Sequence, residues 1–295
     1  MIVIELLKAI LYGIVEGITE WLPISSTGHL ILLEEWLPFS FTRDAVLLAE
    51  FGEMFEVVIQ LGAILAVVVL FWSKLWPFSK AKDVADRQKT WNLWLKVLIA
   101  SVPAAAVGIL GDKLIEKLTG KDIDGWIFNP VVVAIALIVY GIAFIVIERL
   151  HKPQGEQVKT VEDISYRSAF LVGLFQILAM VPGTSRSGST ILGSMLIGFS
   201  RPAAAEFSFF MAIPVMVGAS GIKVLGFLGL LSETGVQVPL LAWGILALAC
   251  AVSFAVSMVA IRFLTDFVKR HSFASFGVYR IALGILVILY FALAR

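Results

Sequence analysis

Residues 182–190 place one arginine and five hydroxyl groups in an otherwise apolar part of the chain, with the sequence Pro-Gly-Thr-Ser-Arg-Ser-Gly-Ser-Thr. The flanking runs, 169–181 and 191–199, are apolar, and each is shorter than the roughly 20 residues that a membrane-spanning helix needs. A cation at membrane depth indicates a functional site. We therefore predict a helix that breaks in mid-membrane, with its hydroxyls and free backbone N–H groups facing a cavity.

A second polar break lies near the N-terminus. Glu16 and Glu20 are four residues apart and so share one face of a helix. Residues 23–29 follow, with the sequence Pro-Ile-Ser-Ser-Thr-Gly-His. The three consecutive hydroxyl residues suit the N-cap of a short helix, expected over roughly residues 26–37, with His29 in its first turn. Two such breaks in corresponding parts of two halves favour one shared site.

The side chains of the two breaks suit a phosphate group. Helix N-termini, hydroxyl caps and a guanidinium all favour an oxyanion. Two carboxylates beside them would repel that anion unless a proton or a divalent cation intervened, so the combination predicts phosphoryl chemistry with a bound metal or a carboxylate base. The polar residues expected at this site are Glu16, Glu20, Ser25, Ser26, Thr27, His29, Thr184, Ser185, Arg186, Ser187, Ser189 and Thr190.

The composition indicates an integral membrane protein built from helices. Of 295 residues, 59% are hydrophobic and only 15% are charged, and the mean hydropathy is +0.95. Soluble domains are far more polar. The net charge of +1, with no dense basic patch, argues against a nucleic-acid partner. The single cysteine, Cys250, cannot form an internal disulfide. The sequence leaves a homodimer open.

The apolar runs predict one membrane domain, 1–295, that is an inverted-topology repeat. Residues 1–149 form the first repeat, 150–165 a polar linker and 166–295 the second repeat. Each half is expected to contain one re-entrant helical hairpin and three transmembrane helices, and this odd number of crossings inverts the second half relative to the first. The expected crossings are 57–73, 93–111, 127–147, 205–231, 239–261 and 277–294, with an interfacial segment at 38–55.

The distribution of basic residues predicts the orientation. The segment from Lys74 to Lys96 contains six lysines or arginines and two acidic residues, which is typical of the cytoplasmic side. The hairpin of the first half would then enter from the outside and that of the second half from the cytoplasm. Their tips would meet near the bilayer midplane.

The two motifs resemble those of the undecaprenyl-diphosphate phosphatase family of bacteria, which is also known for bacitracin resistance. The resemblance rests on Glu16-x-x-x-Glu20 with residues 23–29, and on residues 182–190, and it extends over essentially the whole chain. It implies an enzyme of the bacterial plasma (inner) membrane that hydrolyses undecaprenyl (C55 polyprenyl) diphosphate to undecaprenyl phosphate and inorganic phosphate. Such an enzyme recycles the lipid carrier of cell-wall synthesis, with its site open to the periplasm or outer face.

The resemblance also implies roles for individual residues. Arg186 would clamp the diphosphate. Glu16 and Glu20 would hold a divalent cation, Mg²⁺ or Ca²⁺, or Glu20 would activate the nucleophile. Ser26, His29 and water remain alternatives for the nucleophile itself. The residues expected to help bind the substrate are Ser25, Thr27, Thr184, Ser185 and Ser187.

The chief rival function is that of a polyprenyl-phosphate flippase or a secondary transporter. Such proteins also bind their substrates at the midplane, between broken helices of inverted repeats. Composition does not separate the two functions. Turnover of a polyprenyl diphosphate in detergent would separate them, because hydrolysis needs no bilayer.

Overall fold

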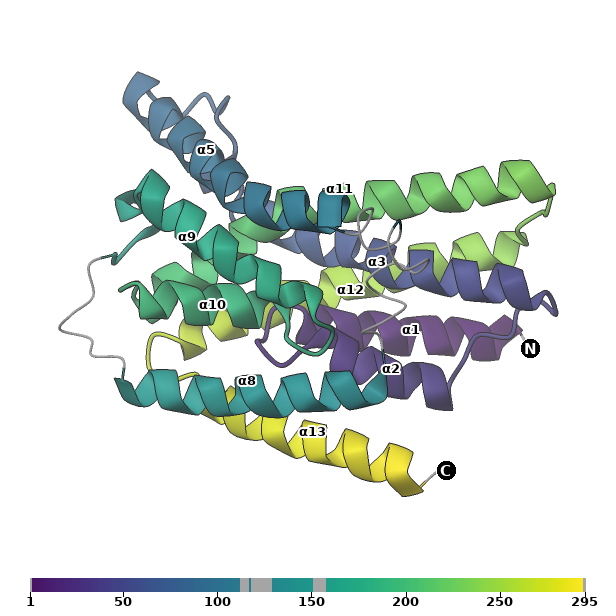
Figure 1. Ribbon diagram of the computed structural model, residues 1–295. Helices are drawn as coiled ribbons and strands as arrows, with labels where there is room; N and C mark the ends of the chain where they lie inside the picture. Colours follow the sequence, from purple (N-terminus) through teal and green to yellow (C-terminus); the bar gives the residue numbers. More distant parts are fainter. Residues whose placement is uncertain (1, 112–116, 118–128, 151–157, 294–295) are drawn as a thin grey trace.

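Six long helices dominate the computed structural model, which describes residues 2–111, 117, 129–150 and 158–293. Within these residues, six helices are long and apolar enough to cross a membrane (Figure 1). The protein is therefore an all-helical, multi-pass membrane protein, as the sequence predicted. The six are α3 (Ala45–Leu70), α5 (Val84–Ala106, prolonged by the π-helical η1, Val107–Gly111), α8 (Pro130–Leu150), α11 (Arg201–Thr234), α12 (Leu240–Phe267) and α13 (Ala274–Leu293). Residues 151–157 of the expected linker lie outside the described part of the chain.

The first long crossing begins earlier than we predicted. Residues 45–55 are helical rather than interfacial, and the carboxylate of Asp44 caps their first turn by accepting a hydrogen bond from the Leu47 N–H at 3.0 Å. Phe51 is fully buried. The acidic residues that lowered the local hydropathy are spaced by three, so they gather on one side of the helix and leave the other side apolar. They are Glu50, Glu53 and Glu56.

The basic segment that follows is more helical than we expected. A short helix, α4 (Trp72–Leu75), and the start of α5 at Val84 leave only residues 76–83 between them. Asp83 caps α5, because its carboxylate accepts a hydrogen bond from the Asp86 N–H at 2.8 Å. Lys96 consequently lies well inside α5 rather than in a loop.

Both predicted interruptions are present, each between two helices. In the first half, α1 (Ile2–Thr19) precedes the break and α2 (Ser26–Trp36) follows it. In the second half, α9 (Tyr166–Ile177) and the 3₁₀ turn η4 (Leu178–Met180) precede the break, and α10 (Arg186–Leu196) follows it. The first pair lies toward the end of the molecule that holds the N-terminus, and the second pair lies toward the opposite end (Figure 1). The breaks therefore approach each other from opposite ends.

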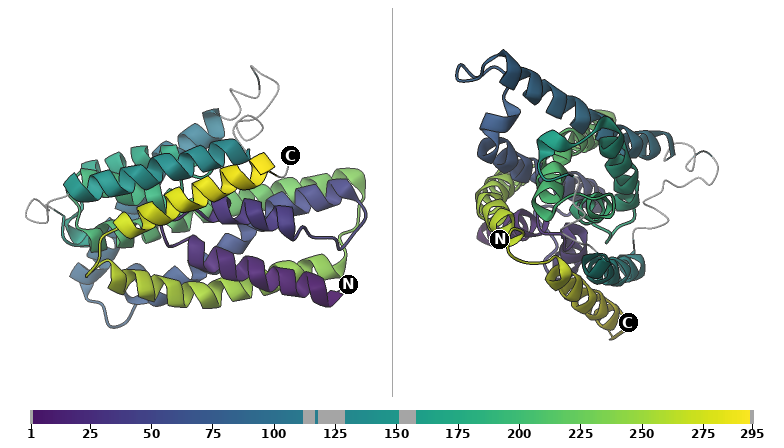
Figure 2. Two further views of the ribbon diagram at one scale, coloured as in Figure 1. Left: turned by 90° about the horizontal axis from the view of Figure 1, so that it is seen from below. Right: turned by 90° about the vertical axis from the view of Figure 1, so that its left-hand side faces the viewer.

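Close backbone contacts hold the broken helices against the long ones. α1 packs on α12, and α9 packs on α5. A methyl group built on Gly13 would lie 2.6 Å from the Ala249 carbonyl oxygen, and one on Gly173 would lie 2.3 Å from the Ala100 carbonyl oxygen. Small residues allow membrane helices to approach this closely. Apart from these pairs, α8 and α13 lie side by side along one flank of the molecule (Figure 2).

Candidate active site

The two breaks share an unusual backbone turn. Ser25 and Ser185 have φ values of 75° and 72°, and within the described residues they are the only residues other than glycine with positive φ. Each serine hydroxyl accepts a hydrogen bond from a backbone N–H three residues later, that of Gly28 at 3.3 Å and that of Gly188 at 3.2 Å. The backbone of a residue other than glycine is strained by about 1–3 kcal/mol at such φ values, and strain of this kind is concentrated at functional sites. The turn places Ser26 and Arg186 at equivalent first positions of α2 and α10.

A buried carboxylate joins the two halves. Glu20, at the end of the first hairpin arm, is only 5% exposed. Its Oε1 accepts a hydrogen bond from Arg186 Nη2 at 3.1 Å, and its Oε2 accepts one from Ser26 Oγ at 3.2 Å. Three of the four residues predicted to be catalytic are therefore in direct contact, although 166 residues separate Glu20 from Arg186 in the sequence.

The Arg186 guanidinium is held in place from several sides. Its Nη1 donates to the Ser208 carbonyl oxygen of α11 at 2.7 Å, and its Cζ lies 5.9 Å from the centre of the Trp21 ring. The Ser208 hydroxyl in turn hydrogen-bonds to the Thr190 hydroxyl at 2.7 Å. Ser208 was assigned no role in the sequence analysis, because a serine inside a long apolar helix does not by itself indicate which residue it contacts.

The remaining hydroxyl groups differ in their hydrogen-bond partners and burial. Ser187 Oγ donates to the Glu20 carbonyl oxygen at 3.2 Å and lies 3.1 Å from Ser185 Oγ, so it connects the breaks directly. Thr184 Oγ1 is buried without a hydrogen-bond partner in the described structure. Thr27 lies half-buried in the first turn of α2. In contrast, the Ser189 hydroxyl is used within its own helix, where it donates to the Ser185 carbonyl oxygen at 3.1 Å.

His29, in the first turn of α2, contacts α13 and has no hydrogen bond to Glu16 or Glu20 among the described residues. Its Nδ1 is 2.7 Å from the Ser25 carbonyl oxygen, and its Nε2 is 2.7 Å from the hydroxyl of Tyr279, on which the imidazole also stacks. Because a carbonyl oxygen can only accept, Nδ1 carries the proton and Nε2 accepts from Tyr279 in the neutral ring. Both ring nitrogens are thereby engaged, whereas the Ser26 hydroxyl contacts a carboxylate.

Glu16 is the most isolated polar group of the site. It is 0% exposed, one helical turn before Glu20, and neither carboxylate oxygen has a hydrogen-bond partner in the described structure. A buried carboxylate without compensation is costly, so this position favours a proton or a cation. Within the described residues no three His, Cys, Asp or Glu side chains gather as a metal site. The residues that could hold a cation here are Glu16 and Glu20.

Arg280 is a further buried residue of this region to which the sequence analysis assigned no role. It lies on α13, is 0% exposed, and donates from Nη1 to the Pro23 carbonyl oxygen at 3.1 Å. Its Nη2 donates to the carbonyl oxygens of Gly183 and Thr184 at 2.7 and 2.8 Å. One guanidinium thus holds the backbone of both breaks. An arginine inside an apolar crossing was a signal that could have revealed it.

We expect the Arg280→Met variant to lose both stability and the alignment of the two breaks. Three buried carbonyl groups would lose their charged donor, and each hydrogen bond to a charged group contributes about 1.5–3 kcal/mol. The midpoint of thermal unfolding in detergent should fall clearly, and Arg280→Lys should recover part of the loss. Arg262→Met, at an exposed position of α12, is the matched control. Equal unfolding midpoints for Arg280→Met and the control would contradict this role.

The fold and the site together define a polytopic membrane protein with a buried arginine–carboxylate–hydroxyl cluster suited to an oxyanion. The chain belongs to the bacitracin resistance protein BacA family, whose profile matches residues 9–286. Three relatives named undecaprenyl-diphosphatase are similar over nearly their whole length. The one from Lactococcus lactis subsp. cremoris (strain SK11) is 52% identical over 98% of both chains. Those from Acetivibrio thermocellus and Streptococcus mutans are 50% and 51% identical, over 99% and 98% of this chain and 100% and 97% of theirs.

Proposed function

We propose that this protein is an undecaprenyl-diphosphatase, which hydrolyses undecaprenyl diphosphate to undecaprenyl phosphate and inorganic phosphate. The observation that carries the proposal is the Glu20 carboxylate, shared by Arg186 and Ser26 where the two breaks meet. The name of the relatives supplies the substrate. Among the described residues, the six apolar helices fit a substrate that stays in the lipid while its diphosphate enters a polar cluster.

Substrate binding is assigned to Arg186 and to the two helix starts. The guanidinium offers paired N–H donors to the oxygens of the terminal phosphate, and the first turns of α2 and α10 direct free N–H groups to the same region. Hydroxyls at the breaks add neutral donors, which bind an anion without adding charge. They belong to Ser25, Thr27, Thr184, Ser185 and Ser187.

The geometry favours Ser26 as the nucleophile and Glu20 as its base. Ser26 Oγ would attack the terminal phosphorus while its proton passes to Glu20, and the bond from that phosphorus to the bridging oxygen would break. Undecaprenyl phosphate leaves, and water then hydrolyses the phosphoserine to release inorganic phosphate. Direct attack by a water that Glu20 activates is the alternative. His29, with both nitrogens engaged, is assigned to positioning the first turn of α2.

A divalent cation fits the unpartnered carboxylate of Glu16. Glu16 and Glu20 are the residues that would hold it, because Mg²⁺ is commonly bound by one or two carboxylates together with substrate phosphates. Bound Mg²⁺ or Ca²⁺ would neutralise charge on the diphosphate. The Glu20 carboxylate also orients Arg186 and Ser26, one through each of its oxygens.

An inverted-topology repeat accounts for the arrangement of the helices. If α1 corresponds to α9 and α5 to α12, the contact of α1 with α12 is equivalent to the contact of α9 with α5. The helices α8 and α13, which correspond to each other, are also in contact. In that pair, a methyl group on Gly141 would meet the Gly277 carbonyl oxygen at 2.7 Å, and one on Gly277 would meet the Gly141 carbonyl oxygen at 2.6 Å. The matching serine turns at the two breaks give further support. On this proposal, residues 1–149 and 166–295 would be equivalent halves of one domain.

The site is proposed to open to the periplasm or outer face, because the basic segment from Lys74 to Lys96 marks the opposite side as cytoplasmic. Membrane-impermeant labelling of cysteines introduced at Thr42, between α2 and α3, and at Ser272, between α12 and α13, tests the orientation. Labelling of Thr42→Cys alone in intact cells is expected. Labelling of Ser272→Cys alone would show that the orientation is the opposite of the one proposed.

Purified protein in detergent should release inorganic phosphate from undecaprenyl diphosphate without any bilayer. A chelator should stop the release, and Mg²⁺ or Ca²⁺ should restore it. Undecaprenyl phosphate, which has no anhydride bond, serves as the control substrate and should yield no phosphate. Binding without turnover would instead support the transporter or flippase. Full activity in excess chelator would show that no divalent cation is needed, while the proposed hydrolase activity would still stand.

A further inference from the structure

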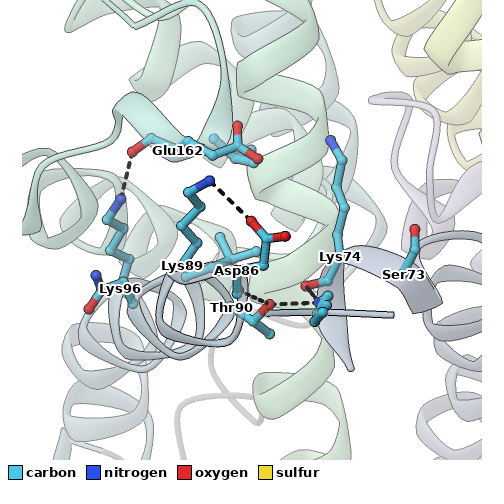
Figure 3. A pocket seen from close by; sticks show the side chains of 11 residues that line it. Ser73, Lys74, Asp86, Lys89, Thr90, Lys96 and Glu162 are labelled. Carbon is cyan, nitrogen blue, oxygen red and sulfur yellow. Dashed lines mark hydrogen bonds and ion pairs between the residues drawn. The ribbon is translucent and has the colours of Figure 1, made fainter. Parts of the chain in front are cut away.

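A basic cavity lies apart from the proposed active site, between the α4–α5 segment and the 3₁₀ turn η3 (Val161–Asp163) that precedes α9 (Figure 3). Its volume is about 230 Å³, and no residue of the Glu20–Arg186 cluster lines it. Lysines in the lining outnumber acidic residues by four to two. They are Lys74, Lys82, Lys89 and Lys96, against Asp86 and Glu162.

Two of these lysines are held by neutral acceptors. Lys82 Nζ donates to Thr90 Oγ1 at 2.7 Å and to the Trp76 carbonyl oxygen at 2.9 Å. Lys96 Nζ donates to the Glu162 carbonyl oxygen at 2.9 Å, and Lys96 is only 9% exposed. Neutral acceptors fix an ammonium group without cancelling its charge. Lys96 is the more buried of the two, and although the carboxylates of Glu162 and Asp163 also act on it, its ammonium group favours an anion in the adjoining space.

The other two lysines form ion pairs. Lys74 Nζ lies 2.5 Å from Glu206 Oε1, and Lys89 Nζ lies 3.1 Å from Asp86 Oδ1. The Lys89 pair is largely exposed, so it is weak and can open to a ligand at little cost. Figure 3 shows Lys89 and Asp86 between Lys96 on one side and Lys74 on the other. The cavity can therefore present several ammonium groups to one anion.

An exposed aromatic cluster adjoins the cavity. Trp72 stacks on Trp76 with ring centres 4.7 Å apart, and Phe78 joins Trp76 to Trp91 by edge contacts. All four side chains are exposed. Trp72 directly precedes Ser73, which lines the cavity. Because tryptophan rings gather at the level of lipid headgroups, the cluster places the cavity at that level of the membrane.

We propose that this cavity binds the phosphate group of an anionic membrane phospholipid, independently of the diphosphatase reaction. Basic pockets between membrane helices on the cytoplasmic side suit such headgroups. The cavity is smaller than the roughly 300–1,000 Å³ of sites for drug-sized ligands, which fits a headgroup phosphate rather than a whole large ligand. The aromatic cluster supplies an apolar surface for the acyl chains, which a free phosphate would not use.

Native mass spectrometry of the full-length protein in detergent tests the proposal, with phosphatidylglycerol, phosphatidylcholine and inorganic phosphate as probes. Phosphatidylglycerol should bind more tightly than phosphatidylcholine. Lys96→Gln should weaken its binding about fivefold, and Lys82→Gln/Lys96→Gln should weaken it about fivefold more, because each lysine near the membrane surface contributes about 1 kcal/mol. Lys269→Gln, at an exposed position after α12, should change nothing.

The Asp86→Asn variant shows whether weaker lipid binding in the lysine variants comes from the lost positive charge or from misfolding. It removes a negative charge from the lining, so it should tighten phosphatidylglycerol binding about fivefold, whereas a folding defect would weaken binding in every variant. Equal binding of the two lipids, or lysine variants that bind like the wild type, would overturn the proposal. If inorganic phosphate bound in a lysine-dependent way and neither lipid were preferred, the occupant would not be a phospholipid, and the cavity would be a site for soluble phosphate.

Discussion

Arg186→Ala is expected to lower phosphate release from undecaprenyl diphosphate by about 10³-fold or more, while the protein still inserts into the membrane. Removing a donor to a developing oxyanion costs about 10²–10³-fold, and removing an arginine that stabilises phosphoryl transfer costs about 10³–10⁵-fold. Arg186→Lys should recover little activity, because an ammonium lacks the paired donors of a guanidinium. Phosphate release in detergent at saturating substrate is the measurement.

The same variant should also be less stable, since it leaves the Glu20 carboxylate buried without its partner. Removing one member of a buried ion pair typically costs about 3–5 kcal/mol. Both side chains are mostly buried here, so solvent screens the pair little. The double variant Glu20→Gln/Arg186→Ala should regain stability but not activity. Arg167→Ala, at an exposed position of α9, is the control. Near-normal turnover in Arg186→Ala would remove this residue from the site.

Ser26→Ala is expected to lower the turnover rate by at least about 10³-fold, and His29→Ala by no more than about 10²-fold. The first change removes the hydroxyl that Glu20 contacts, whereas the second disturbs positioning, which can cost up to about 10²-fold. Both variants are measured side by side in the phosphate-release assay. Ser189→Ala is the control, because that hydroxyl is used within its own helix.

The outcomes separate the three mechanisms that the sequence left open. A larger loss in His29→Ala than in Ser26→Ala would favour a phosphohistidine. Retained activity in both variants would leave attack by water as the mechanism. Acid quenching during turnover adds an independent measurement, since phosphoserine survives acid and phosphohistidine does not. An acid-stable phosphoenzyme that disappears in Ser26→Ala would identify the serine directly.

Local sequence predicted the breaks better than it predicted the bounds of the long helices. Three consecutive hydroxyl residues after Pro23 predicted the start of α2, and Ser26 is its first residue. The start of α3 at Ala45 was missed, because the glutamates in its first turns lowered the hydropathy of a segment whose opposite face is buried. A hydropathy average discards the face on which a residue lies, and that face decides whether it is buried.

The residues that sequence reasoning missed act across the fold. Arg280 is 257 residues from Pro23, whose carbonyl it binds, and Tyr279 is 250 residues from His29. Ser208 contacts Arg186 from a neighbouring helix. None of them was assigned a role in the sequence analysis, because their partners lie on helices that are distant in the sequence.

The sequence by itself determined the membrane class, the six apolar crossings and the two polar breaks, because each depends on hydrophobicity and capping within about 20 consecutive residues. The tertiary structure decided that Glu20 bonds to both Arg186 and Ser26, that Glu16 has no partner, and that Arg280 holds both breaks. Such contacts depend on how distant helices pack against one another. No local pattern of residues encodes that packing.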